Sequence, residues 1–165
     1  MTDLKTTVLF DLDAEFANTR RVLERAPDDQ LGWKPHPKSF SLGSLGAHIA
    51  NLVGWQTTTL TTTELDLGVE RPRTVQPTST VELLETFDRN LETFRTTFAE
   101  ADDESLSAMW TLRFGERVLL AMPRVQVLRG SGLSHLIHHR GQFTVYLRLL
   151  DVPVPGLYGP TADEQ

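Results

Sequence analysis

The chain has 165 residues, with 16 Lys and Arg against 22 Asp and Glu, so its formal net charge is −6 at pH 7. It contains no cysteine, which excludes disulfides, cysteine nucleophiles and cysteine-ligated metal sites and leaves His, Asp and Glu as metal ligands. An acidic chain with scattered basic residues lacks the charge that neutralises a phosphate backbone, so we expect no nucleic-acid partner.

We expect a single domain over residues 1–165, because this length is typical of one domain and can bury a core unaided. Residues 1–5 contain no basic stretch and do not lead into the apolar core of a signal peptide. The longest apolar run, residues 118–122, is much shorter than the roughly 20 residues that span a bilayer. The expectation is therefore a cytoplasmic protein with no membrane partner.

The first third of the chain predicts two helices separated by a loop. Apolar residues recur every three or four positions over residues 4–23, which predicts a helix that ends at Pro27. Residues 26–41 hold three prolines and a glycine, so no helix is expected there. Ser41 is a suitable N-cap for a second helix, whose apolar face includes His48.

A long connection follows the second helix. The Thr-rich run at residues 57–63 is a poor helix former. Gly68, Pro72 and Pro77 mark a connection of at least about a dozen residues, which is long for a helix bundle. A crossover is possible at this point.

A third helix is expected from Ser79 to near Ala101. Ser79 and Glu82 form a capping-box pattern, in which the hydroxyl faces the Glu82 amide and the carboxylate reaches back. The apolar residues that follow keep a three-four spacing, which predicts packing along neighbouring helices. These residues are Leu84, Phe87, Leu91, Phe94 and Phe98.

Residues 105–122 change from a helical to an alternating pattern. Every second residue from 110 to 114 is apolar, and Gly115 can make a turn, so a short hairpin or extended loop is expected. Pro123 suits the first turn of a last helix that runs to about Leu150.

These elements predict an all-α fold. We expect a four-helix bundle with a long connection between the second and third helices and a short extended insert before the fourth. Six glycines within the second and fourth helices each cost about 1 kcal/mol relative to Ala. Close helix contact, including contact in a dimer, and frayed helices are the two explanations for Gly43, Gly46, Gly54, Gly130, Gly132 and Gly141.

The fourth predicted helix carries three of the five histidines, at positions 135, 138 and 139. At about 100° per residue, His135 and His139 share the apolar side of this helix, whereas His138 points away. Imidazoles four residues apart can direct two nitrogens at one metal ion. His48, on the apolar face of the second helix, would complete a three-histidine site with an open position.

The sequence pattern leaves two interpretations of these histidines open. They bind a divalent metal, or they are core histidines bonded to backbone or to Gln142, although burying three imidazoles without partners is costly. Arg140 and Tyr146 are candidates for orienting a substrate, against the alternatives of an ion-paired arginine and a core tyrosine. Zinc-peptidase, nucleophile-elbow, phosphate-loop and dinucleotide-binding motifs are absent.

Several stretches of the chain match one family. They are Trp33 with its polar loop, residues 45–49 around His48, residues 135–142 with the following Tyr146, and the closing residues 154–164. Together they resemble the DinB/YfiT-like superfamily of DNA-damage-inducible proteins and related metalloenzymes. The resemblance implies a four-helix bundle, usually a homodimer, in which His48, His135 and His139 hold a divalent ion such as nickel or zinc.

The resemblance also implies chemistry with a low-molecular-weight thiol co-substrate, such as bacillithiol or mycothiol. The first hypothesis is an enzyme in which the ion lowers the pKa of a bound water or thiol and presents it to a small-molecule electrophile. No Asp or Glu can be placed beside the histidines as a general base, which favours thiol transfer over hydrolysis. The alternatives are a metal-dependent hydrolase and a non-catalytic metal-binding or stress-response binding protein.

Overall fold

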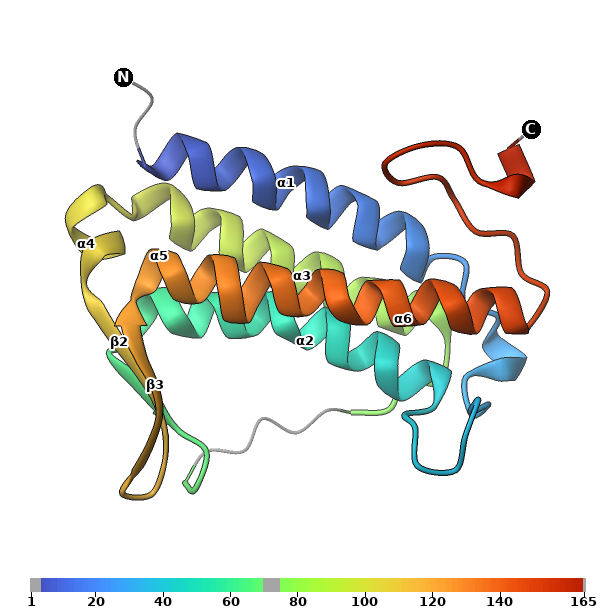
Figure 1. The fold of residues 1–165 in the computed structure, drawn as a ribbon, viewed down its shortest axis with the longest axis horizontal. Coiled ribbons are helices and arrows are strands. Elements are labelled where there is room, and N and C mark those ends of the chain that lie inside the picture. Colours follow the sequence, from blue (N-terminus) through green and yellow to red (C-terminus); the bar gives the residue numbers. More distant parts are fainter. Residues whose placement is uncertain (1–3, 70–74, 165) are drawn as a thin grey trace.

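The computed structural model describes residues 4–69 and 75–164, and four long helical segments lie side by side in it (Figure 1). The first three are α1 (Leu4–Leu23), α2 (Leu42–Thr61) and α3 (Thr80–Glu100). In the fourth, α5 (Arg124–Val127) continues through a π-helical turn, Leu128–Ser134, into α6 (His135–Leu149). Short helices occur at α4 (Asp103–Ser107), Asp28–Gln30 and Ala162–Glu164. None of the helices in these ranges is both long and apolar enough to cross a bilayer.

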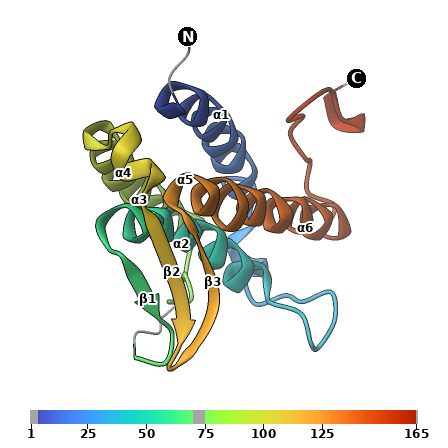
Figure 2. The ribbon, with the colours of Figure 1, turned by 60° about the vertical axis from the view of Figure 1, so that its left-hand side comes forward.

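A small mixed sheet shows that the prediction of a purely all-α fold is wrong. Strand β1 (Glu64–Asp66) pairs in parallel with β2 (Met109–Phe114), which pairs antiparallel with β3 (Arg117–Pro123). The strands follow α2 and precede α5, and they lie to one side of the long helices (Figure 2). The β2–β3 hairpin confirms the extended insert. Strand β1 was not predicted, because three residues are too few to show an alternating pattern and its partner is distant in sequence.

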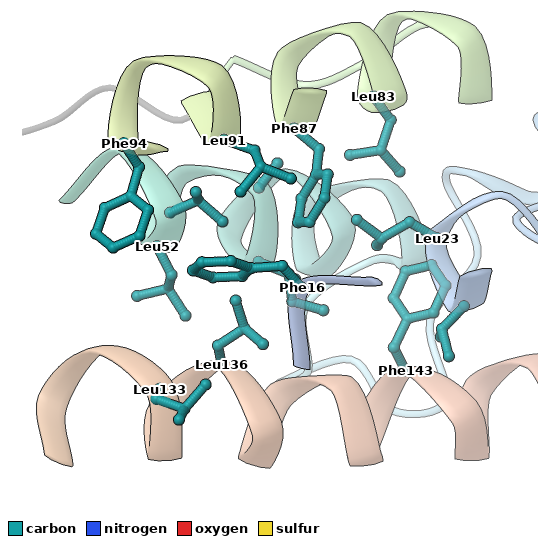
Figure 3. Packing of buried hydrophobic residues seen from close by; sticks show 14 of the residues in the cluster. Phe16, Leu23, Leu52, Leu83, Phe87, Leu91, Phe94, Leu133, Leu136 and Phe143 are labelled. Carbon is teal, nitrogen blue, oxygen red and sulfur yellow. The ribbon is translucent and has the colours of Figure 1, made fainter. Parts of the chain in front are cut away.

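The main hydrophobic core lies between the four long helical segments (Figure 3). Phe16 of α1 and Phe94 of α3 meet edge to face with ring centroids 5.5 Å apart, a favourable aromatic geometry. Leu136 and Phe143 of α6 are fully buried in the same cluster. Their burial fixes the rotation of α6 about its axis, and therefore the side on which the histidines of this helix emerge.

Helix α2 continues to Thr61, so most of the Thr-rich run is helical despite its weak helix propensity. The hydroxyl groups of Thr59, Thr61 and Thr62 donate to backbone carbonyls four residues earlier, at 3.2, 3.0 and 2.8 Å. These bonds satisfy the hydroxyls within the helix, and the complete burial of Thr59 offsets its weak helix propensity. Within the connection that follows, Pro72 lies outside the described residues.

The start of α3 differs in detail from the expected capping box. Ser79 accepts the N–H of Glu82 at 3.2 Å, as predicted. The Glu82 carboxylate, however, accepts from the backbone N–H and the hydroxyl of Thr78, one residue earlier than expected. On the buried face Leu83 enters the core, whereas Leu84 lies at its edge.

Close helix contact explains three of the in-helix glycines, which are Gly46, Gly54 and Gly132, whereas Gly43 lies against Leu31 in the loop before α2. At Gly46 and Gly132 a Cβ atom would lie 2.8 Å from a side chain of the facing helix, which is closer than two carbon atoms approach. Among the described residues, no heavy atom lies within 4 Å of a Cβ built at Gly130 or Gly141.

Candidate metal centre

Three histidines from two helices meet at one point in the fold. His48 comes from α2, and His135 and His139 come from consecutive turns at the start of α6. One ring nitrogen from each lies within 4.8 Å of the other two. In the ranges 4–69 and 75–164, this is the one group of three or more His, Cys, Asp or Glu side chains close enough to share a metal ion.

The distances between the rings suit a shared ion. Nε2 of His135 and Nε2 of His139 lie 2.9 Å apart. Two nitrogen ligands at about 2.1 Å from one ion are about 3 Å apart when they subtend a right angle at it. The ring centroid of His48 lies 5.3 Å from that of His135 and 4.6 Å from that of His139. Three imidazole donors are a ligand set that suits zinc or nickel.

Hydrogen bonds orient the two imidazoles of α6. Nδ1–H of His139 donates to Oε1 of Gln142 at 2.7 Å, which leaves Nε2 of this ring as the ligand atom. Nε2 of His135 faces His139, and hydrogen bonding to the backbone of Ser131 partly opposes the lowering of the pKa of His135 by burial. Both rings therefore turn the same kind of nitrogen, Nε2, toward the shared point.

The π-helical turn explains why the Ser131 carbonyl is available to a side chain. In a regular α-helix this carbonyl would accept the backbone N–H of His135. Here that N–H bonds instead to the carbonyl of Gly132. Short π-helical turns occur often at functional sites, and this one directly precedes the first histidine of α6.

Burial keeps the three imidazoles neutral near pH 7. Desolvation, followed by the proximity of His139 and His135, lowers the pKa of His48 to about 4. Desolvation is also the main cause that lowers the pKa of His135 and the pKa of His139. Neutral imidazole is the form that binds a metal, so protons compete with an ion only at a lower pH than for a free imidazole.

Other residues surround the three histidines without joining them. The ring of Phe40 stacks on His48, with centroids 5.8 Å apart. His138 is exposed and touches His139 from outside the group, with centroids 4.9 Å apart, as its predicted outward direction requires. A cavity of about 530 Å³ adjoins His48 and His135. This cavity could not be predicted from the sequence, because its walls come from α2, the sheet and the π-helical turn together.

Arg140 and Tyr146, the predicted substrate-orienting residues, contact other parts of the fold. Arg140 is 2% exposed, and its guanidinium pairs with Glu15 of α1 and donates to the hydroxyl of Tyr158. Tyr146 packs edge to face on Trp33, with centroids 5.6 Å apart, about two helical turns beyond the histidines. Since neither residue lines the cavity, its position does not support the substrate-orienting role.

A helical core with a three-histidine centre between its second and last long helices defines the class of protein. The chain belongs to the DinB family, whose family model matches residues 1–165. It is 27% identical over 161 residues to the uncharacterized protein YrdA of Bacillus subtilis, an alignment that covers 94% of this chain and 86% of that protein.

Two solved structures show the same fold. A DinB-like protein from Bacillus cereus superposes with a TM-score of 0.67 at 24% identity, covering 92% of this chain and 95% of that one. The DinB-like protein YjoA from Bacillus subtilis superposes with a TM-score of 0.71 at 16% identity, covering 96% of this chain and 99% of that one. The family resemblance drawn from the sequence is thus confirmed.

Proposed function

We propose that this chain is a divalent-metal-dependent enzyme in which His48, His135 and His139 hold the ion. One observation carries the proposal. Nε2 of His135 and Nε2 of His139 lie 2.9 Å apart, and because Nδ1–H of His139 donates to Gln142, the Nε2 lone pair of this ring points at His135. A metal ion between the two nitrogens would bind both rings, whereas burial disfavours an added proton on either of them.

The residues around the site favour a thiol over water as the nucleophile. A divalent ion held here would lower the pKa of a thiol or water that ligates it. Water has a much higher pKa than a thiol, so its ionisation on the ion profits more from a general base, and no Asp or Glu in the described part of the chain joins the three histidines or lines the cavity beside them. A thiol needs no separate base, because its thiolate is itself the nucleophile.

The proposed reaction is transfer of a low-molecular-weight thiol to a small electrophile. The thiolate sulfur attacks an electrophilic carbon, and a carbon–sulfur bond forms as the bond from that carbon to its leaving group breaks. The leaving group departs with the bonding electron pair, and the thiol proton passes to solvent. The histidines would act as ligands and not as bases in this scheme, because one ring nitrogen of each would bind the ion and their pKa values are low.

A thiol panel tests the proposed reaction. Zinc- or nickel-loaded protein is incubated with bacillithiol, mycothiol, glutathione and simple thiols, each with an activated aryl chloride, and thiol loss and chloride release are followed. We expect metal-dependent conjugation that is lost in His135→Ala and retained in His138→Ala.

Generic esters and phosphoesters are assayed in parallel, because a metal-dependent hydrolase is the second candidate. Hydrolysis that needs metal and disappears in His135→Ala, with no thiol consumed in the panel, would refute thiol transfer. Metal binding without turnover of any substrate would instead favour the non-catalytic binding protein.

A further inference from the structure

We propose that the cavity beside His48 and His135 is a substrate site for an electrophile with an uncharged, apolar body of one or two rings. This proposal rests on the proposed function, because His48 and His135 mark the end of the cavity where the electrophilic carbon would react. The residues that line the rest of the cavity determine which kind of chemical group the remainder of the substrate can be.

The lining of the cavity is apolar and carries no full charge. Five of its residues are apolar, and they are Leu52, Trp55, Leu67, Leu112 and Leu120. The others are Asn51, Ser131 and the two histidines, so no Lys, Arg, Asp or Glu lines it. The volume of about 530 Å³ lies within the range of sites that bind small organic molecules.

This apolar wall is the partly exposed edge of a second hydrophobic cluster. The fully buried members of the cluster are Leu65, Trp110 and Val127. Four of the residues packed against it remain only partly buried and line the cavity, namely Trp55, Leu67, Leu112 and Leu120. An apolar ligand that covers this edge removes it from water, which favours binding.

Contacts within the fold hold parts of this wall in place without a ligand. Trp110 donates its Nε1–H to the hydroxyl of Thr62 at 3.0 Å and supports Trp55 edge to face, with centroids 5.4 Å apart. Leu112 and Leu120 are directly opposite each other in the β2–β3 ladder, so their side chains lie on the same face of the sheet. A preformed cavity of this kind selects ligands by shape and polarity.

Charge should therefore decide which compounds bind. A carboxylate, sulfonate or phosphate on the body of the ligand would lose its hydration inside the cavity, and no cation among the lining residues replaces that hydration. We expect selection for neutral compounds, with the electrophilic carbon next to the histidines and the apolar body against Trp55 and the leucines.

Two probes with the same rings test this selection on the zinc-loaded full chain. Naphthalenemethanol is neutral, whereas naphthalenesulfonate carries a charge and is a weak metal ligand. Calorimetry should give a dissociation constant at least tenfold higher for the sulfonate. Leu120→Trp, which fills the cavity, should weaken binding of the alcohol at least tenfold. The matched control is Leu119→Trp at an exposed neighbouring position outside the cavity, and it should change affinity less than twofold.

Equal affinity for the two probes, equal loss in both tryptophan variants, or no saturable binding of the alcohol would each overturn the proposal. Leu112→Trp replaces Leu120→Trp if circular dichroism shows that the latter does not fold. Metal content is measured on the same samples. A chain that holds zinc but no alcohol refutes the cavity alone, whereas a chain that binds the alcohol but no zinc refutes the metal site and retains the cavity.

Discussion

The residues that bind the α6 imidazoles come from the same helical segment as the imidazoles themselves. Gln142 follows His139 by three residues, and Ser131 precedes His135 by four, so the partners of both rings belong to one helical segment, a side chain for His139 and the backbone for His135. His48 reaches the site from α2, where Phe40 stacks on its ring. The centre therefore combines an oriented pair from one helix with a third donor positioned by helix packing.

We expect Gln142→Ala to weaken metal binding about 10- to 100-fold, which is the usual effect of removing a hydrogen-bond partner that orients a metal-binding side chain. The variant removes the acceptor for Nδ1–H of His139 and so frees the ring to rotate. Competition with a chromogenic chelator measures the affinity. Gln126→Ala, at an exposed glutamine of α5, is the control and should stay within twofold of the wild type. Unchanged affinity in Gln142→Ala would contradict the orienting role.

The metal-free protein should lose stability as the pH falls from about 6.5 to about 4. In the unfolded chain His48 titrates near 6.5, whereas in the fold its pKa is about 4. Between these values the unfolded state binds more protons, so stability rises with pH through this window and is lost on acidification. Urea unfolding across the window measures the effect.

The comparison that isolates His48 uses two substitutions. His48→Asn should reduce the slope of this part of the stability profile and leave the share that comes from His135 and His139, whereas His36→Asn, at an exposed histidine, should leave the slope unchanged. A profile for His48→Asn that parallels the wild type would show that burial of this imidazole is not the cause.

Among the elements, the π-helical turn and β1 are the ones that the sequence did not reveal. His135 and His139 nevertheless lie on one side of their helix as predicted, because both are within regular α6, beyond the π-helical turn. Helix ends were predictable where a side chain caps them, as Ser41 and Ser79 do. The cavity was not predictable, because it needs the pairing of β1 with β2, which no local pattern encodes.

Two glycine substitutions test how closely the elements pack. Gly132→Ala should destabilise the fold by about 1–3 kcal/mol, because its Cβ would lie 2.8 Å from Cδ of the buried Gln56. Gly141→Ala meets no described heavy atom within 4 Å and should instead stabilise α6 by up to about 1 kcal/mol. Urea unfolding gives both values. Similar changes in the two variants would contradict the packing at Gly132.

In the whole molecule, the candidate metal centre lies where two hydrophobic clusters meet. The large cluster fills the space between the long helices, and the small one lies between α2, α5 and the sheet. Histidines 48 and 135 line the cavity next to the small cluster. The helices thus place the three histidines, and the sheet supplies much of the proposed substrate wall.

We also expect the chain to form a homodimer, an expectation that rests mainly on the family resemblance. Gly43, Gly46, Gly54 and Gly132 contact other parts of their own chain, so they do not supply the dimer surface considered from the sequence. Light scattering should give twice the chain mass of 18.5 kDa. A mass of 18.5 kDa at high micromolar concentration would show that the protein is a monomer.

The metal content of the purified, folded protein tests the central claim most directly. We predict about one divalent ion per chain by elemental analysis, lost in His48→Ala and in His139→Ala and retained in His138→Ala, whose imidazole lies outside the group of three. Circular dichroism confirms that each variant is folded. Wild-type stoichiometry in both folded His48→Ala and His139→Ala, or loss of the ion in His138→Ala, would contradict this assignment of the metal centre.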